Sequence, residues 1–266
     1  MNSSDPPLVS VIVPTCNRAA ILAETLRSIL GQTFRDFELI VVSDGSTDET
    51  ASIVEKLADP RVVFIEQGPS GRPSVPRNRG LRQARGAFIA LCDDDDLWRP
   101  EKLARQVEFL HGDASIGLCY TNTIALRNGV ERHARLRAGE CVRNLPDLIW
   151  HNYIATSTVL VRKEVFEVVG GFDEEPRLCP FDDYEMWLRI AYRYPIAYMD
   201  ELLVAYRIHE KNIVARFADR ELIAVRVLRT AMQKIPGHRP AFCLSMGARL
   251  GKYLVSALRG HAYRTR

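Results

Sequence analysis

Short apolar runs alternate with helical patterns along residues 1–112. Four runs are rich in β-branched and aliphatic residues and are short enough for buried strands: residues 8–13, 37–42, 61–65 and 87–91. Helical patterns lie between them, in residues 18–30, 47–58 and 76–85. This alternation predicts an α/β fold, in which helices flank both faces of a mostly parallel, twisted sheet.

Polar residues follow three of these predicted strands. They are Thr15, Asp44 and the Asp cluster, which we define as residues 93–96. Ligands of such sheets bind beyond the carboxyl ends of the strands. We therefore expect these side chains to line one crevice.

The pattern is less regular after residue 112. It predicts strands at 116–126, 156–161 and 202–206, and helices at 100–110, 145–150, 164–169, 182–194, 222–232 and 242–258. We expect one domain over residues 1–215, with a first half at 1–112 and a second half at 113–215, followed by a helical extension at 216–266.

Local sequence also predicts how several helices begin. Asn17 is placed to cap the helix that follows the first strand. Ser46 and Glu49 have the spacing of a capping box for the next helix. Asp96 could cap the helix that begins near Pro100.

Composition excludes several protein classes. Hydrophobic residues make up 47% of the chain and the net charge is +3, which gives no overall reason to expect nucleic acid as a partner. No apolar run approaches the about 20 residues of a membrane-spanning helix. Residues 1–7 lack the features of a signal peptide, and the six cysteines are scattered. The expected location is therefore the cytoplasm.

The Asp cluster is the most unusual local feature of the chain. Four adjacent carboxylates repel one another unless a positive charge lies among them. A divalent cation with bound phosphates would resolve this repulsion, because Mg²⁺ and Mn²⁺ prefer oxygen ligands. A solvated acidic turn is the alternative.

Six motifs in order resemble the family-2 glycosyltransferases. They are residues 11–18 (VIVPTCNR), 28–33 (SILGQT), 37–42 (FELIVV), 44–48 (DGSTD), 77–80 (RNRG) and 93–100 (DDDDLWRP). The resemblance extends over about residues 8–209 and implies a GT-A fold. It also implies an inverting, metal-dependent enzyme that moves a sugar from a nucleotide-diphosphate sugar to an acceptor hydroxyl.

The resemblance assigns roles within the nucleotide-binding half. Asp95 would bind Mn²⁺ or Mg²⁺, while Asp93 and Asp94 would hold the nucleotide ribose and assist the metal. Asp44 would contact the nucleotide base, although it could instead close an Asx turn with Gly45. The first loop, with Pro14, Thr15 and Asn17, would wrap the base.

Other positions carry over from the rest of the family pattern. Arg77 and Asn78 match an Arg-Asn motif, and Arg77 would pair with phosphate or with the Asp cluster unless it forms only a surface salt bridge. Asp183 would be the catalytic base and Asp182 a substrate contact, although acids at a helix start also favour the helix dipole.

The closing motif of residues 206–209 (YRIH) would place Arg207 at the phosphates and His209 at the metal or diphosphate.

Two other functions remain open at this point. A sugar-phosphate nucleotidyltransferase would need a glycine-rich loop after the first strand, and residues 14–18 contain no glycine. A catalytically inactive nucleotide-sugar-binding protein would not need the acids at Asp183 and Asp95.

The expected acceptor is a saccharide or a lipid-linked saccharide of surface polysaccharide or glycolipid synthesis. The C-terminal tail is basic and interleaved with apolar residues, which suggests peripheral contact with anionic lipid at the inner face of the membrane. A solvated terminal helix is the alternative.

Overall fold

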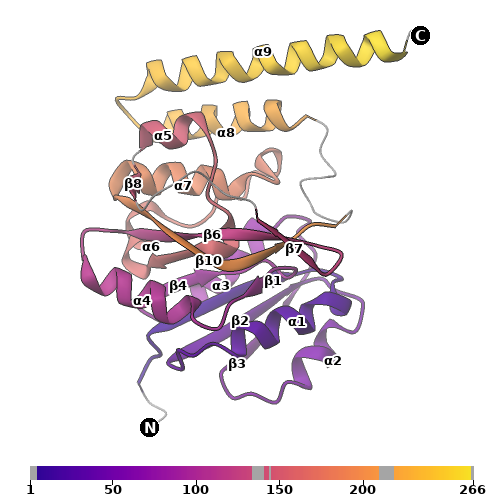
Figure 1. Ribbon diagram of the computed structural model, residues 1–266, viewed down its shortest axis with the longest axis vertical. Coiled ribbons are helices and arrows are strands. Elements are labelled where there is room, and N and C mark those ends of the chain that lie inside the picture. The colour runs from indigo at the N-terminus through magenta and orange to yellow at the C-terminus, as the bar shows by residue number, and fades with distance from the viewer. Residues whose placement is uncertain (1–4, 134–140, 144, 210–218, 265–266) are drawn as a thin grey trace.

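In the computed structural model, one ten-stranded sheet runs through the molecule, with helices on both faces (Figure 1). The structure describes residues 5–133, 141–143, 145–209 and 219–264. The strands are β1 Val9–Thr15, β2 Phe37–Asp44, β3 Val62–Gln67, β4 Phe88–Leu91, β5 Leu97–Trp98, β6 Leu118–Arg127, β7 Val130–His133, β8 Cys141–Arg143, β9 Val159–Arg162 and β10 Ile196–Arg207.

Helices connect most of these strands. They are α1 Ala19–Leu30, α2 Thr50–Glu55, α3 Ser74–Gln83, α4 Lys102–Gly112, α5 Leu145–Trp150, α6 Lys163–Val169, α7 Asp182–Arg193, α8 Arg220–Lys234 and α9 Arg239–Arg264, with short 3₁₀ turns η1 Thr156–Thr158 and η2 Pro176–Leu178.

The strand order is β3-β2-β1-β4-β9-β6-β10-β5, with β7 beside β6 and β8 beside β10. The first four strands are parallel, as expected from the alternation of strands and helices. Beyond β4 the sheet is mixed, because β9 pairs antiparallel with both β4 and β6. The predicted α/β class is confirmed, and its strictly parallel part lies within residues 1–112.

The second half differs from the prediction in its strands. β10 begins at Ile196 and not near residue 202, because Ile196–Met199 is buried and pairs in register with β6. The expected strand at 156–161 begins only at Val159, and residues 156–158 form η1. The short strands β5, β7 and β8 have no periodicity long enough to predict them.

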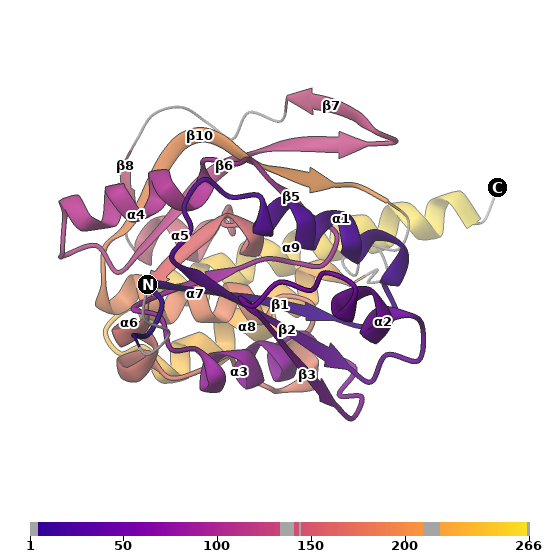
Figure 2. The same cartoon turned by 90° about the horizontal axis from the view of Figure 1, so that it is seen from below.

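Side chains of β1 alternate between two hydrophobic clusters on opposite faces of the sheet. Val9, Val11 and Val13 pack with α1 and α4, whereas Ile12 packs with the cluster that includes α7 and α8. Figure 2 shows α1 and α2 on one side of β1, β2 and β3 and α3 on the other. Burial on both faces explains why these strands read as continuous apolar runs.

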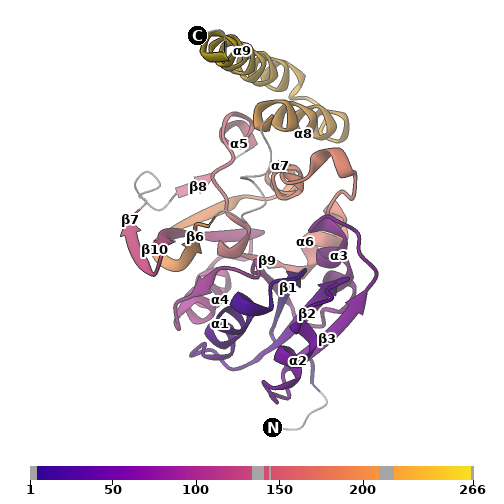
Figure 3. The same cartoon turned by 90° about the vertical axis from the view of Figure 1, so that its right-hand side faces the viewer.

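The C-terminal helices form the end of the molecule opposite β3 (Figures 1 and 3). In Figure 3, α9 is the outermost element, α8 lies beneath it, and α5 and α7 separate both from the sheet. Lys234 of α8 donates to Asp173 at 2.6 Å and to the buried Glu185 of α7 at 3.0 Å. Within the described ranges, no helix has both the length and the apolarity to cross a bilayer.

The close packing of α3 on β1 predicts a stability difference between two glycine variants. An alanine Cβ at Gly80 would lie 2.4 Å from Cγ2 of the fully buried Ile12, whereas nothing lies within 4 Å of one at Gly247 on α9. We expect Gly80→Ala to lower the free energy of unfolding by about 1–3 kcal/mol. Gly247→Ala should raise it by about 0.5–1 kcal/mol, since alanine favours helix. Denaturant unfolding measures both, and equal stability of the two variants would refute this packing.

Candidate active site

The parallel strands bring the predicted site residues to one edge of the sheet. Thr15 at the end of β1 donates through Oγ1 to Oδ2 of Asp94 at 2.8 Å. The end of β2 lies beside it, since Thr15 pairs with Ser43, the residue before Asp44. Thr15, Asp44 and the Asp cluster therefore lie together at this edge of the sheet.

The first loop is braced against the turn after β2, which corrects two helix-cap predictions. Asn17 adopts φ 52°. Its side-chain Oδ1 accepts from the backbone amide of Thr47 at 2.8 Å, and its backbone amide donates to Ser46 Oγ at 3.1 Å. Asn17 is therefore not the cap of α1, and Ser46 does not cap α2. Asp48 instead accepts from the amide of Ala19, at the start of α1, at 2.9 Å.

Asp44 organises the loop after β3. Its Oδ1 accepts from Gln67 Nε2 at 2.8 Å and from the Ser70 amide at 2.9 Å, and its Oδ2 accepts from Ser70 Oγ at 2.9 Å. The Asx-turn alternative is wrong, because the Ser46 amide donates to Ser43 Oγ instead. Asp44 thus connects the end of β2 to the loop of residues 67–71.

Burial raises the pKa of three carboxyl groups in the Asp cluster. Burial and then repulsion by Asp95 raise the pKa of Asp94 to about 7. Burial and Asp93 raise the pKa of Asp95, although Arg18 and His209 oppose the rise. Burial and Asp95 also raise the pKa of Asp96. The cluster is therefore no solvated acidic turn, and added positive charge would favour its ionised form.

The predicted closing motif lies against the Asp cluster. His209 Nε2 lies 3.0 Å from Oδ2 of Asp95, and the Arg18 guanidinium lies 3.6 Å from the same oxygen. Arg207 donates through Nε to the Asp95 carbonyl at 2.9 Å and through its guanidinium to Glu24 at 2.7 Å. Arg18 was not among the predicted site residues, and its signal was its place at the end of the first motif.

Asp96 has a different role from the predicted helix cap. It is 1% exposed, and its Oδ1 accepts from the backbone amide of Arg207 at 3.0 Å. The residue at the N-cap of α4 is Glu101, and β5 separates it from Asp96. Asp96 therefore joins β10 to the cluster.

Arg77 connects the Asp cluster to the start of α7. Its guanidinium donates to Asp93 at 2.7 Å and to Asp182 at 3.1 Å, and its side chain is only 5% exposed. Burial would lower the pKa of this guanidinium, but Asp93 and Asp182 reverse the effect and raise it. The alternative of a surface salt bridge is therefore wrong.

Asn78, the next residue of this motif, holds the loop that precedes α7. Its amide nitrogen donates to the Phe172 carbonyl at 2.9 Å and to Glu174 at 2.7 Å, and its Oδ1 accepts from the Phe172 amide at 2.8 Å. These bonds use both ends of the amide, so Asn78 positions the loop.

Asp183 lies at the start of α7, in the first turn, where the helix dipole favours an anion. Its Oδ2 accepts from Thr156 Oγ1 at 2.9 Å and its Oδ1 accepts from the Tyr184 amide at 2.6 Å. Desolvation and then Asp182 raise the pKa of Asp183 to about 7, while Arg77 and the Thr156 bond oppose the rise. Burial likewise raises the pKa of Asp182 against the pull of Arg77.

Sequence reasoning missed the η1 turn, which connects Asp183 to Asp93 of the Asp cluster. Thr156 holds Asp183, and the next residue, Ser157, accepts through Oγ from the Asp93 amide at 3.0 Å. The indole of Trp98 donates to the Ser157 carbonyl at 3.0 Å. The signal was three consecutive hydroxyl residues, 156–158, in a segment that otherwise reads as a buried strand.

The donor set is compatible with a divalent cation. Asp95 supplies a carboxylate oxygen and His209 an imidazole nitrogen 3.0 Å away, a combination that suits Mn²⁺ and admits Mg²⁺. In the part of the chain that the structure describes, no three His, Cys, Asp or Glu side chains converge as a complete ligand set. Oxygens of a bound diphosphate would have to supply the remaining positions.

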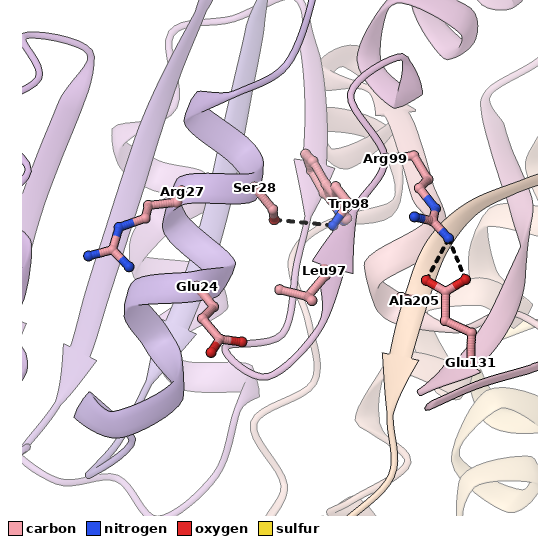
Figure 4. A pocket seen from close by; sticks show the side chains of 8 residues that line it. All are labelled: Glu24, Arg27, Ser28, Leu97, Trp98, Arg99, Glu131 and Ala205. Carbon is pink, nitrogen blue, oxygen red and sulfur yellow. Dashed lines mark hydrogen bonds and ion pairs between the residues drawn. The ribbon is translucent and has the colours of Figure 1, made fainter. Parts of the chain in front are cut away.

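A separate pocket of about 380 Å³ lies behind β5 and contains none of the predicted site residues (Figure 4). It is lined by Glu24, Arg27, Ser28, Leu97, Trp98, Arg99, Glu131 and Ala205. Figure 4 shows Arg99 paired with Glu131, at 2.6 Å, and the Trp98 amide donating to Ser28 at 3.1 Å.

Solved structures share the fold of this chain. TarS of S. aureus in complex with UDP-GlcNAc superposes with a TM-score of 0.74 over 91% of this chain and 71% of that protein, at 23% identity. The mannosyltransferase PcManGT of Pyrobaculum calidifontis, in complex with GDP-Man and Mn2+, gives a TM-score of 0.67 over 98% of this chain and 81% of that one, at 21% identity. The fold is therefore the GT-A fold.

Curated relatives match most of the chain. A putative teichuronic acid biosynthesis glycosyltransferase of Bacillus subtilis, TuaG, is 30% identical over 78% of this chain and 81% of its own length. WfaP of Escherichia coli, a UDP-Glc:alpha-D-GlcNAc-diphosphoundecaprenol beta-1,3-glucosyltransferase, is 27% identical over 89% of this chain and 91% of its own length.

The family model for glycosyl transferase family 2 matches residues 10–170, which include all but the first residue of β1, the Asp cluster and the η1 turn. That span covers more than half of the chain and contains all six motifs in full, from residues 11 to 100. The chain belongs to glycosyl transferase family 2.

Proposed function

We propose that this protein transfers a sugar from a nucleotide-diphosphate sugar to an acceptor hydroxyl, with inversion at the anomeric carbon and Asp183 as general base. The observation that carries the proposal is the shared anchoring of Asp183 and the Asp cluster. Arg77 joins Asp93 to Asp182, and η1 joins Asp93 to Asp183. Hydrogen bonds thereby connect the proposed proton acceptor to the proposed diphosphate site.

In the proposed reaction, Asp183 accepts the proton of the acceptor hydroxyl as its oxygen bonds to the anomeric carbon. The bond from that carbon to the diphosphate oxygen breaks on the opposite face, and the nucleoside diphosphate leaves as an anion. A pKa of about 7 suits a general base at neutral pH. A divalent cation bound by Asp95 and His209, with Asp93 assisting, would neutralise charge on the leaving diphosphate.

The remaining predicted residues would bind the donor. Pro14 and Thr15 at the end of β1, with Asn17 just after it, lie beside the end of β2 and Asp44, which suits the nucleoside, and Asp94 lies against Thr15. Arg207 would reach the phosphates by exchanging its bond to Glu24. Arg18, between Asp95 and His209, joins this set as a second cation for the diphosphate.

Relatives suggest the class of acceptor. WfaP is named for an acceptor sugar on diphosphoundecaprenol, and TuaG for teichuronic acid biosynthesis. We extend this to a hydroxyl of a saccharide, free or carried on a polyprenyl diphosphate, in the synthesis of cell-surface polysaccharide or glycolipid.

The first prediction concerns the base. Asp183→Asn should lower the rate of transfer by about 10²–10⁴-fold, because an amide cannot accept the proton. Donor affinity, measured by calorimetry with the nucleotide sugar and Mn²⁺, should stay within about threefold, since Asp183 acts on the acceptor. The exposed Asp36→Asn is the matched control. Unchanged turnover in Asp183→Asn would rule out the base role.

The second prediction concerns pH. Activity should fall as the pH drops through about 7, because protonated Asp183 cannot act as a base. Thr156→Val removes a hydrogen bond that favours the carboxylate, so it should move this acid limb upward by about 0.5–1 pH unit. Thr158→Val is the control, since Thr158 donates to Ala155 and not to Asp183. An acid limb that stays in place in Thr156→Val would contradict the assignment.

The third prediction concerns the metal. Asp95→Ala should lower the Mn²⁺-dependent affinity for nucleoside diphosphate by at least about 10-fold, as expected for lost ligation. Titrations of UDP and GDP with and without Mn²⁺ separate this effect from binding of the nucleoside alone. If the variant keeps the full gain in affinity on adding Mn²⁺, Asp95 is not the metal ligand.

A further inference from the structure

Helix α9 carries apolar side chains on its outward side as well as on the side that faces the core. Its outward side carries Leu244, Leu250 and Leu254, which are 65%, 40% and 59% exposed. Gly247 and Gly251 lie between them on the same exposed side, with no atom within 4 Å of where a Cβ would stand. The result is a continuous apolar surface, which we call the outer leucine face (residues 244, 247, 250, 251 and 254).

Polar and aromatic side chains of α9 point inward instead. Ser245 is 1% exposed and donates to the Ile149 carbonyl at 2.7 Å, and Phe242 is fully buried. Arg249 donates to Glu221 of α8 at 3.2 Å and to the Trp150 carbonyl of α5 at 3.1 Å. These contacts fix which side of α9 faces the protein, so the outer leucine face is a stable feature of the fold.

Positive charge is concentrated in the same part of the chain. Nine of the 36 lysines and arginines follow Glu221, and none of the 33 acids does, so residues 222–266 carry +9 and residues 1–221 carry −6. The exposed Arg239 and Lys252 flank the outer leucine face on the two sides of the helix. Arg226 and Arg229 are exposed on the neighbouring α8.

An exposed tryptophan lies beside the side of α9 that faces the protein. Trp150, at the end of α5, is 43% exposed, and its carbonyl accepts from Arg249 of α9. Tryptophan favours the boundary between lipid and water, where its ring is buried and its N–H stays hydrated.

Charge decides between two occupants of this surface. A second copy of the chain would bring two cationic segments together, which opposes self-association through α9. An anionic lipid surface attracts the same cations and accepts the leucines into its apolar layer. The outer leucine face covers only one side of α9, and α9 is not apolar enough to span a bilayer. Both features suit a helix that lies flat on the membrane surface.

We propose that α9 docks the protein on an anionic membrane surface, with the outer leucine face in the acyl boundary and Arg239 and Lys252 at the lipid phosphates. Docking in this way would bring the enzyme to a lipid-borne acceptor, but the inference does not depend on the proposed reaction. Membrane binding and transfer can be measured separately.

Vesicle sedimentation with the full chain tests this proposal. Binding should be at least tenfold tighter to vesicles of phosphatidylcholine with phosphatidylglycerol than to phosphatidylcholine alone, and should weaken in high salt. The triple variant Leu244→Ser, Leu250→Ser, Leu254→Ser should bind at least tenfold more weakly. Arg239→Glu with Lys252→Glu should lose the preference for phosphatidylglycerol.

Val168→Ser is the matched control, since Val168 on α6 is 60% exposed and lies outside α9. Nucleotide-sugar hydrolysis with Mn²⁺ should be equal in parent and triple variant, which shows that the variant is folded. Equal vesicle binding by parent and triple variant would overturn the proposal. A second result would also overturn it: the parent fails to bind vesicles, and sedimentation velocity shows a dimer of the parent that the triple variant does not form.

Discussion

The buried guanidinium of Arg77 is the interaction on which the site depends. Burying a cation is costly unless carboxylates accompany it, and here Asp93 and Asp182 come from segments that are 89 residues apart. Removal of Arg77 would leave the buried Asp182 without its cation. Arg77 therefore holds the Asp cluster, which follows β4, against the start of α7.

The same burial tunes the acids of the site. Desolvation is the largest cause that raises the pKa of both Asp94 and Asp183 to about 7. Repulsion by Asp95 adds to the rise at Asp94, and repulsion by Asp182 adds to it at Asp183. In the proposed reaction, Asp94 would lie with the diphosphate and Asp183 with the acceptor. Positive charge brought close to either carboxyl would favour its ionised form. The layer of α7, α8 and α9 supports this arrangement, since Lys234 compensates the buried Glu185 on α7.

Much of this could be predicted from the sequence, because the strands of the first half are buried on both faces and their apolar runs are unambiguous. Their parallel order then places Thr15, Asp44 and the Asp cluster together. Local signals failed where a distant partner competed for the same group. Asn17 binds Thr47 and not the helix that it precedes, and Asp96 binds the amide of Arg207 across 111 residues.

The roles of Thr156 and Ser157 could not be predicted from the sequence for a similar reason. Thr156 and Ser157 matter only because the fold brings Asp183 and Asp93 to them, and nothing in a run of hydroxyls identifies those partners. The outer leucine face of α9 could not be predicted either. Apolar residues occur on both sides of this helix, and the contacts of Ser245 and Arg249 show which side faces the protein.

The most direct test of the account is the anomeric configuration of the released sugar. The protein would be incubated with Mn²⁺ and an α-linked nucleotide sugar, with water as acceptor, and the first-formed anomer followed by NMR before mutarotation. A single displacement assisted by Asp183 predicts the β anomer, formed with release of nucleoside diphosphate and lost in Asp183→Asn. The α anomer, or release of pyrophosphate, would contradict the proposed reaction.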